Sequence, residues 1–554
     1  MHTKHKILLG LLSIIIAFSF WFYQRIIFNA PISDISYSST VEIRKLTNTH
    51  YVSGNSWLRL NKYGNWECYI EGNGFKRGVT LGKLQEKLAQ DQESVFVAEI
   101  DKNIPSWWFK KLLTLGISWF NRDLDQFIPS EYREEIYGIS LFFSDKYDYI
   151  GPKYNRIINY HAAHDIGHAV QNMHLVGCTA FGSWNFDSIQ QQMITGRTFD
   201  FYFGDDFAKN KVILMSKPDS GYKNISVTWA GFTGVVSGIN EKGIGITLNS
   251  DKSEIPTKSG TPVSIIARDV LQYASSINEA IAICSKYTAF VSESFTISSA
   301  IDQQIIVLEK TPNQTGIYYP KSDTIIVTNH FQSPELKNLP INIEHKKTSE
   351  SVKRYNRTEE LVRSLKSINQ NNIAKILRDQ KGLNNTNIGH GNPLAINQLL
   401  AHHAVIFENV KKLIWVSAYP FQENVMQAYS LSDFDSWVAS KIEFPLTVDS
   451  LLILPDTFYT SSKFKQFEEF KSLRQQIKQA TNSKEILAKE TISDFVKTNP
   501  NYYQTYQLIG NYFFEINKLD TAIKFYQKAL TKEIAYSEDA DFIHNQIIEI
   551  NNHD

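Results

Sequence analysis

The sequence predicts an α+β protein with an apolar N-terminal segment and a helical C-terminal region. From residue 177 onward, short β-rich runs lead into two helices near residues 262–276 and 277–286, and strands then return up to residue 328. Strands and helices come in groups, which favours a layered α+β core over a series of βαβ units. The 554 residues are enough for about two to four domains.

The first 28 residues predict a membrane segment. A basic start precedes an apolar run over residues 7–22, and the run ends in the aromatic triplet Trp21-Phe22-Tyr23. This pattern indicates a signal peptide or a retained signal anchor. There is no Ala-x-Ala exit site and no lipobox cysteine, and aromatic residues are typical of a membrane interface. We therefore favour a retained anchor with the rest of the chain outside the cytoplasm; a cleaved signal and a secreted protein are the alternative.

The charge balance argues against nucleic acid as a partner. Lys and Arg together number 57, as do Asp and Glu, so the formal net charge is zero. No basic field, RNP signature or zinc-finger spacing is present to attract or read a nucleic acid.

The elements ahead of residue 177 are a hairpin and several helices. Residues 51–75 alternate as a hairpin that turns at Gly64-Asn65, and an amphipathic helix is expected from about Lys83 to Asp91. Residues 105–120 and 129–175 look mostly helical. After residue 177, strands are expected at residues 225–229, 233–238, 245–249, 295–297, 304–309 and 324–328.

The last hundred residues are helical and contain a repeat. Ala488, Ile492 and Phe495 recur 34 residues later as Ala522, Tyr526 and Ala529. A period of 34 residues with small and aromatic positions resembles a tetratricopeptide repeat, which usually binds peptides or braces a neighbouring domain.

Cys178 is the candidate nucleophile. It follows Gly177, and breaking the Gly177–Cys178 bond would free an α-amine with a pKa near ~8 beside a thiol with a pKa near ~8.5. One residue would then supply both nucleophile and base. A buried strand cysteine is the simpler alternative.

Five further side chains are candidates for the same site. Arg197 and Asp200, three residues apart, could form a pair that holds the thiolate and the new ammonium group. Asn249 ends one expected strand and Asn329 follows another, and an amide at a strand end can stabilise an oxyanion; turn formation is the alternative. Arg354 begins a helix and could meet an anion, or lie on a solvated face.

Two other groups have competing interpretations. His161, His164, Asp165 and His168 would share one helix face with a spacing that can bind zinc, but the Glu of His-Glu-x-x-His is missing. Cys68 and Cys284 could form a disulfide in an oxidising compartment or stay as buried thiols. We expect neither a metal nor a cofactor.

Taken in order, these motifs resemble the N-terminal nucleophile hydrolases that use a cysteine, and above all the C45 group of acyl-CoA:6-aminopenicillanate acyltransferase-like proteins. Choloylglycine hydrolases, penicillin V acylases and acid ceramidases are more distant. The resemblance spans residues 55–420. It rests on the following runs: Arg77-Gly78, Pro129-x-x-Tyr132-x-x-Glu135-x-x-Gly138, Gly177-Cys178-Thr179, Gly196-Arg197-x-x-Asp200-Phe201, Gly238-x-Asn240-Glu241-x-Gly243, Thr328-Asn329-His330-Phe331 and Ser351-x-x-Arg354.

The resemblance implies an αββα four-layer sandwich and self-cleavage between Gly177 and Cys178. It also implies that Arg197 and Asp200 order the nucleophile and its amine. Asn329 would be the oxyanion donor, the Asn249 region would give a second donor, and Arg354 would support them.

The predicted organisation has four parts: an anchor (1–28), an N-terminal part of the core with the pro-segment (29–177), the catalytic core (178–455) and the helical tail (456–554). The predicted function is hydrolysis or transfer at an amide or thioester bond through an acyl-Cys178 intermediate. The substrate would be an acylated small molecule or lipid, and the tail could bind a protein partner. A degenerate membrane-anchored scaffold is the alternative, and a zinc enzyme using His161, His164 and His168 is the third.

Overall fold

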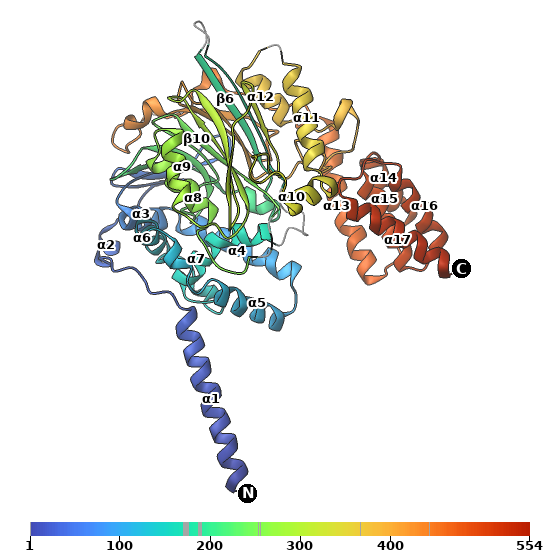
Figure 1. Ribbon diagram of the computed structural model, residues 1–554, viewed down its shortest axis with the longest axis horizontal. Coiled ribbons are helices and arrows are strands. Elements are labelled where there is room, and N and C mark those ends of the chain that lie inside the picture. The colour runs from blue at the N-terminus through green and yellow to red at the C-terminus, as the bar shows by residue number, and fades with distance from the viewer. Residues whose placement is uncertain are drawn as a thin grey trace.

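A long N-terminal helix, a central body with two β-sheets and a helical C-terminal region make up the molecule (Figure 1). The computed structural model describes residues 2–169, 177–186, 191–252, 254, 256–365, 367–442 and 444–553. The helices are α1 (His2–Ile26), α2 (Ser36–Thr40), α3 (Gly74–Leu84), α4 (Glu86–Asn103), α5 (Trp107–Phe120), α6 (Ser130–Ser140), α7 (Lys153–Ala169), α8 (Val263–Tyr273), α9 (Ile277–Ser285), α10 (Pro340–Thr348), α11 (Ser351–Arg363), α12 (Gln370–Leu377), α13 (Ser462–Ser483), α14 (Lys489–Thr498), α15 (Tyr503–Glu515), α16 (Leu519–Leu530) and α17 (Ser537–His553).

The strands form two sheets. They are β1 (Arg44–Thr47), β2 (His50–Ser53), β3 (Ser56–Leu60), β4 (Trp66–Gly72), β5 (Thr179–Phe186), β6 (Gln191–Phe199), β7 (Lys211–Pro218), β8 (Asn224–Trp229), β9 (Ser237–Asn240), β10 (Ile244–Ser250), β11 (Glu293–Ser299), β12 (Gln304–Lys310), β13 (Thr315–Tyr318), β14 (Thr324–Val327), β15 (His403–Glu408), β16 (Leu413–Ser417) and β17 (Met426–Ser430). In the described part of the chain, the larger sheet has eleven strands in the order β1-β2-β3-β4-β7-β8-β9-β10-β11-β12-β13. The smaller has six, in the order β14-β5-β6-β15-β16-β17.

A pair of parallel strands connects the part of the chain before the candidate cleavage point with the part after it. β4 runs parallel to β7, with Cys68 opposite Leu214, whereas its neighbour β3 is antiparallel to it. Strands before residue 177 therefore complete the same sheet as strands that follow it.

Helices cover the outer face of each sheet, so the body has four layers. Ile213 and Val227 of the larger sheet meet Val405 and Val416 of the smaller sheet in a buried apolar layer. On the other face of the larger sheet, α3, α6, α8 and α9 contribute to the largest core cluster. α12 packs on the outside of the smaller sheet, for instance through Ile373. Because side chains alternate between the two faces of a strand, β15 contributes apolar side chains both to the layer between the sheets and to the layer under α12.

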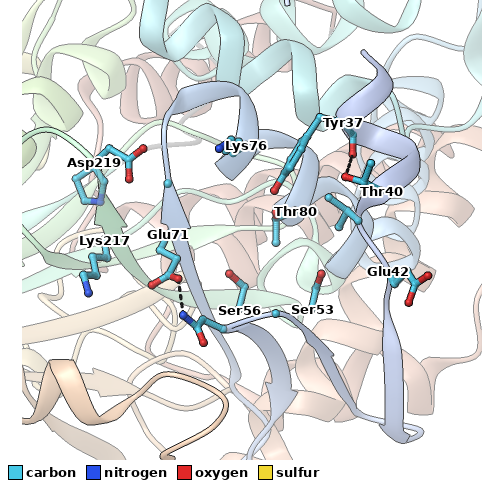
Figure 2. A pocket seen from close by; sticks show the side chains of 15 residues that line it. Tyr37, Thr40, Glu42, Ser53, Ser56, Glu71, Lys76, Thr80, Lys217 and Asp219 are labelled. Atoms are coloured by element: carbon cyan, nitrogen blue, oxygen red, sulfur yellow. Dashed lines mark hydrogen bonds between the residues drawn. The ribbon is translucent and has the colours of Figure 1, made fainter. Parts of the chain in front are cut away.

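A polar groove of about 860 Å³ opens at the ends of strands β2, β3, β4 and β7 of the larger sheet (Figure 2). Tyr37, Lys76 and Thr80 line one side of it, and Glu71 and Lys217 come from the neighbouring strands β4 and β7.

α3 and α6 cross at very short range because glycines face the contact. A Cβ at Gly74 would lie 2.2 Å from the backbone oxygen of Glu131, and one at Gly78 would lie 2.1 Å from that of Glu135. Gly82 repeats the spacing of four residues, which places all three on one helix face. The Arg77-Gly78 and Glu135 motifs therefore belong to a helix crossing.

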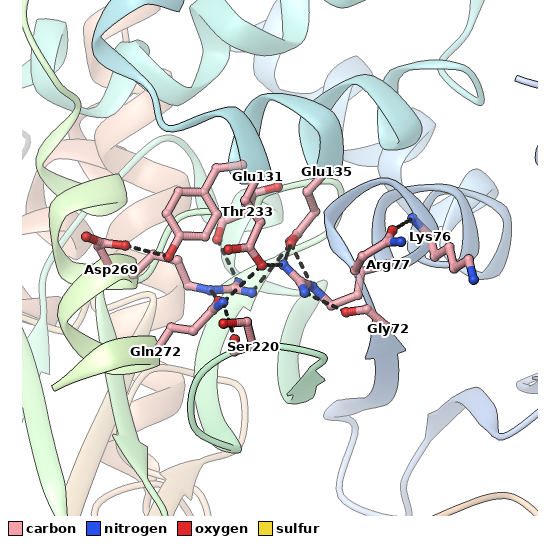
Figure 3. Close-up of polar contacts among 12 residues, drawn as sticks. Gly72, Lys76, Arg77, Glu131, Glu135, Ser220, Thr233, Asp269 and Gln272 are labelled. Atoms are coloured by element: carbon pink, nitrogen blue, oxygen red, sulfur yellow. Dashed lines mark hydrogen bonds and ion pairs between the residues drawn. The ribbon is translucent and has the colours of Figure 1, made fainter. Parts of the chain in front are cut away.

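A buried ionic cluster holds this crossing against the sheet (Figure 3). The Arg77 guanidinium contacts Glu135 at 2.6 Å and Glu131 at 2.8 Å. Arg268 of α8 approaches the same Glu135 carboxylate at 3.5 Å and donates to the Thr233 carbonyl at 3.1 Å. These charges are compensated inside the helix layer, which assigns them a structural role.

The C-terminal helices pack against a core segment, residues 388–399. Asn499 accepts a hydrogen bond from the His390 amide and donates one to the His390 carbonyl, at 3.1 and 2.8 Å. Gly389 is left-handed with φ of 82°, and a Cβ there would lie 2.6 Å from the Tyr502 nitrogen. Within the tail, the missing side chain of Gly510 allows the Tyr526 ring to pack closely against the helix. The region is helical, as expected; its assignment as a tetratricopeptide repeat stays a prediction.

Some of the expected elements have different bounds. The helix expected from about Lys83 to Asp91 corresponds to α4, which runs from Glu86 to Asn103. The residues before it form a further helix, α3, capped by the Asn73 side chain, because its three glycines are contact positions rather than turn signals. The strand expected at residues 233–238 begins at Ser237, and the preceding residues form a loop. Of the helical stretch expected at 129–175, the described part contains α6 and α7, and residues 170–176 lie outside the described residues.

The three cysteines are free and buried, so the Cys68–Cys284 disulfide was wrong. Cys68 lies on β4, whereas Cys284 lies on α9, which packs near β11. Five strand spacings of about 4.8 Å separate β4 from β11 in the sheet, far beyond disulfide reach.

Candidate active site

Cys178 lies between the two sheets, directly before β5, and only 1% of it is exposed. The Arg197 guanidinium of β6 donates to the Cys178 sulfur at 3.5 Å. The same guanidinium donates to Ser237 Oγ at 3.1 Å and to the Leu248 carbonyl, which fixes it between the sheets. The sequence-predicted pairing of Cys178 with Arg197 is thus present as a contact.

Burial dominates the electrostatics of the thiol. It raises the pKa of Cys178 to about 11, although the Arg197 charge acts in the opposite direction. The Asp200 and Glu293 carboxylates raise the pKa further. In the uncut chain the sulfur is therefore protonated at neutral pH, and a reaction must first remove that proton.

Asp200 approaches the site mainly through its backbone. Its carbonyl accepts from the Gly177 amide at 3.1 Å, while its carboxylate accepts from Thr198 Oγ1 at 3.0 Å. Arg197 and Asp200 share no ion pair in the described part of the chain, contrary to the expected direct pair, because residues three apart on a strand point to opposite faces. Burial raises the pKa of Asp200 to about 7.

Arg354 is the hub that joins the candidate residues. It is fully buried on α11 and donates to the Cys178 carbonyl at 2.7 Å and to Thr179 Oγ1 at 2.8 Å. Its other nitrogen donates to Asn329 Oδ1 at 2.6 Å and to Glu350 Oε1 at 2.8 Å. The arginine therefore fixes the backbone of the candidate nucleophile.

The two asparagines differ in what they offer. Asn329 donates to the Ser250 carbonyl at 2.6 Å, which uses one of its two amide hydrogens. Asn249 donates to the carbonyls of Val327 and Thr328 at 3.2 and 3.0 Å, so both of its hydrogens are used. In this arrangement Asn329 is the better placed to donate to an oxyanion.

Gln398 is a site residue that the sequence did not reveal. Its amide nitrogen donates at 3.0 Å to the carbonyl oxygen of Gly177, which belongs to the bond that cleavage would break. A Cβ on Gly177 would lie 2.6 Å from that same nitrogen, so a larger residue there would displace the Gln398 side chain. No motif surrounds Gln398, and the only local sign is structural: the next residue, Leu399, is left-handed with φ of 54°.

A buried polar chain continues behind Arg197, and it too escaped the sequence interpretation. Ser237 Oγ lies 2.9 Å from His403 Nε2, and His403 Nδ1 lies 2.8 Å from His402 Nδ1. Burial lowers the pKa of both histidines well below the ordinary value, so both rings are neutral. Burial also lowers the pKa of Lys211, close to His402, to about 7.

The hydrogen bonds of His161 argue against the alternative that it is a zinc ligand. His161 Nδ1 lies 2.7 Å from the Ile157 carbonyl, and Nε2 accepts from the Thr233 amide at 2.9 Å. Asp165 accepts from the Val263 amide at the start of α8. The side chains of His164 and His168 lie outside the described residues, and within the described ones no cluster of His, Cys, Asp or Glu could hold a metal.

The polar groove of Figure 2 is separate from this site. None of the residues that line it is a candidate catalytic residue, and it is formed by elements around α2 and α3. Cys178 itself is almost fully buried and does not line that groove.

The central part of the chain matches a known family. Residues 188–404 match the family model described as "Acyl-coenzyme A:6-aminopenicillanic acid acyl-transferase". The matched range includes the candidate residues from Arg197 to Gln398 and begins after Cys178. This region is therefore similar to an acyltransferase family, over less than half of the chain.

Other similarities are partial. An uncharacterized protein of Archaeoglobus fulgidus is 23% identical over 310 residues, which cover 49% of this chain and 51% of that protein. The chain thus spans about half the length of this relative. Among solved structures, a Caenorhabditis elegans N-acylethanolamine-hydrolyzing acid amidase ortholog is 14% identical, with a TM-score of 0.30, over 42% of this chain and 93% of its own. A mutant of the conjugated bile acid hydrolase from Clostridium perfringens is 14% identical, with a TM-score of 0.31, over 46% and 93%. Such low scores carry no argument about fold or function.

Proposed function

We propose that the chain is a self-processing cysteine amidohydrolase or acyltransferase with Cys178 as nucleophile. The observation that carries the proposal is the set of hydrogen bonds around the Gly177–Cys178 bond. Asp200 accepts from the Gly177 amide, Gln398 donates to the Gly177 carbonyl and Arg354 donates to the Cys178 carbonyl. Three distant parts of the chain thus hold the backbone of Gly177 and Cys178, and Gln398 contacts the peptide bond between them. The match to an acyltransferase family supports the reaction class.

Self-cleavage would begin with attack on the preceding peptide bond. Cys178 Sγ gives up its proton and adds to the Gly177 carbonyl carbon, and the carbonyl oxygen becomes an oxyanion. Gln398 Nε2 already donates to that oxygen, so it would stabilise the developing charge. The C–N bond then breaks, the Cys178 nitrogen takes its electron pair and a proton, and Gly177 is left as a thioester on Sγ. Water hydrolyses the thioester and releases a Gly177 carboxylate and a free Cys178.

The same residue would then perform the turnover reaction. The free α-amine of Cys178 accepts the thiol proton, and the sulfur attacks the carbonyl of an acylated substrate. Asn329 donates to the oxyanion, and Arg197, 3.5 Å from the sulfur, favours the thiolate. The oxyanion collapses, the C–N or C–S bond of the substrate breaks, and the leaving amine or thiol takes the proton held by the α-amine, so that the acyl group stays on the sulfur as a thioester. The acyl group then passes from sulfur to water in hydrolysis, or to an amine in transfer, and the Cys178 thiol is restored.

The substrate class and location follow from the rest of the chain. α1 contains a predominantly apolar span of 23 residues, Lys4–Ile26, whose apolar window is not buried, and it is long enough to cross a bilayer or to serve as a signal sequence. We propose that it is a retained anchor and that the body lies outside the cytoplasm. An N-acylated lipid or amino acid near the membrane surface is the proposed substrate class. Binding of a protein partner by the helical tail is a further part of the proposal.

The test is a comparison of purified variants for self-cleavage and for an acyl-enzyme. Cys178→Ala is expected to stay uncut and to form no thioester with an acylated probe. Gln398→Ala is expected to slow cleavage by about 10²–10³-fold, the usual loss for one oxyanion donor. Gln332→Ala is the matched control, because Gln332 also donates to a backbone carbonyl of the smaller sheet, that of Ile326 at 2.8 Å. Cleavage of Cys178→Ala at the wild-type rate would overturn the proposal.

A further inference from the structure

α5 exposes a large apolar surface although it belongs to the folded body. No residue of this helix is buried. Trp108 is 57% exposed, Leu112 58% and Phe109 47%, while Trp107 at the N-terminal end reaches 71%. Apolar side chains of this size normally lie in a core or against a partner.

The helix is amphipathic. Trp108, Leu112, Leu115 and Trp119 follow one another at spacings of four, three and four residues, so they lie on one face. Phe109 and Leu113 widen this face. The opposite face carries the following residues: Lys110, Lys111, Thr114 and Ser118.

The C-terminal end of α5 is fixed to the base of α1. The Trp119 ring is stacked on Phe22 with ring centroids 5.2 Å apart and planes within 10°, and it also contacts Trp21 at 5.7 Å. One turn farther on, Arg25 lies 3.7 Å from Asp123. α5 meets α1 only near the end of the apolar span, and Figure 1 shows it on the side of the body from which α1 projects.

These contacts fix the depth of α5 relative to α1. Phe22 precedes the last residue of the apolar span, Ile26, by four residues, which corresponds to about 6 Å along a helix. Amphipathic helices that lie in a membrane interface bury their apolar face by about 5–10 Å. A bilayer crossed by α1 would therefore meet the apolar face of α5 at the depth that such a helix adopts.

We infer that α5 is an interfacial membrane helix, which lies in the boundary between headgroups and acyl chains beside the anchor. Trp108 and Leu112 enter the acyl region, and Lys111 reaches the phosphate groups from the polar side. The inference rests on the proposed role of α1 as an anchor. Two attachments instead of one prevent the body from swivelling, and they hold it in a fixed orientation on the membrane.

The test uses single cysteines that carry an environment-sensitive fluorophore in the full-length protein. Leu112→Cys probes α5, Ile14→Cys probes α1, and Ile486→Cys in the tail is the solvent control, since Ile486 is 68% exposed. Each of the three variants is made in the Cys178→Ala background, so that the candidate nucleophile takes no label, and Cys68 and Cys284 are buried. The protein is reconstituted into phosphatidylcholine vesicles, with or without phosphatidylserine, that contain a lipid quencher placed high or deep on the acyl chain.

The Leu112→Cys label is expected to shift to the blue and to be quenched most by the shallow quencher. The Ile14→Cys label is expected to respond most to the deep quencher, and the Ile486→Cys label to neither. If the Leu112→Cys label is no more quenched than the tail control while the Ile14→Cys label is quenched, α5 does not lie in the membrane and the inference is wrong, although α1 still crosses it. If neither label is quenched, the anchor itself fails. Disulfide-linked dimers through Leu112→Cys would identify a second copy as the occupant and also overturn it.

Discussion

Replacing Arg354 with methionine tests whether the site is built around a buried charge. The change keeps much of the side-chain volume but removes four hydrogen bonds of 2.6 to 2.8 Å. It also leaves Glu350, whose side chain is 5% exposed, without its cation. Removing one partner of a buried ion pair costs about 3–5 kcal/mol of unfolding free energy. Urea unfolding of the detergent-solubilised protein, followed by tryptophan fluorescence, measures the loss.

The same helix provides a matched control. Arg363 contacts Glu359 with the same spacing and the same distance of 2.8 Å as Arg354 and Glu350, but 75% of the Arg363 side chain is exposed. Exposed pairs at this spacing contribute about 0.3–0.5 kcal/mol. If Arg354→Met shifts the urea midpoint no more than Arg363→Met, the account of Arg354 as a buried hub is wrong. Restoration by the added change Glu350→Gln would support it.

Three further outcomes follow from the structure. Gly78→Ala places a Cβ 2.1 Å from a backbone oxygen of α6 and is expected to cost about 1–3 kcal/mol, whereas Gly116→Ala, with nothing within 4 Å, is expected to be neutral or stabilising in the same urea assay. Asp200 has a pKa raised to about 7, so its contribution to stability is present below its unfolded value and is lost as the pH rises to about 7. The unfolding free energy of the wild type, relative to that of Asp200→Asn, is expected to fall by about 4 kcal/mol between pH ~4 and ~8. If the two unfolding free energies changed with pH in parallel, the buried position of Asp200 would be contradicted. Asn499→Ala removes both bonds to the His390 backbone and is expected to speed hydrogen exchange in residues 388–399 and to slow self-cleavage; unchanged exchange would refute the bracing role of the tail.

Local pattern predicted much of the fold. Short apolar runs located the strands of residues 225–229 and 304–309 within one residue of their observed bounds, because runs of this length are typical of strands that are buried on both faces, as both of these are. The α3 helix was missed because glycine normally signals a turn, whereas Gly74 and Gly78 form a contact with α6 that only the tertiary structure reveals. The pairing of β4 with β7 is equally non-local.

The candidate site likewise contains residues that the sequence could predict and residues that it could not. Arg197 and Arg354 belong to ordered motifs, and the structure brings both to the candidate nucleophile. Gln398 and His403 have no motif, since their roles depend on a loop and a strand more than 200 residues from Cys178 meeting it in space. The helical tail was expected to bind a partner or to brace a neighbouring domain, and it packs on the segment that supplies Gln398.

N-terminal sequencing of the purified protein tests the central claim most directly. The account predicts two polypeptides, of which the larger begins at Cys178, and a single uncut chain for Cys178→Ala. A wild-type protein that remains one chain across Gly177–Cys178 in intact-mass analysis, while turning over an acylated substrate, would contradict self-processing as the source of its nucleophile.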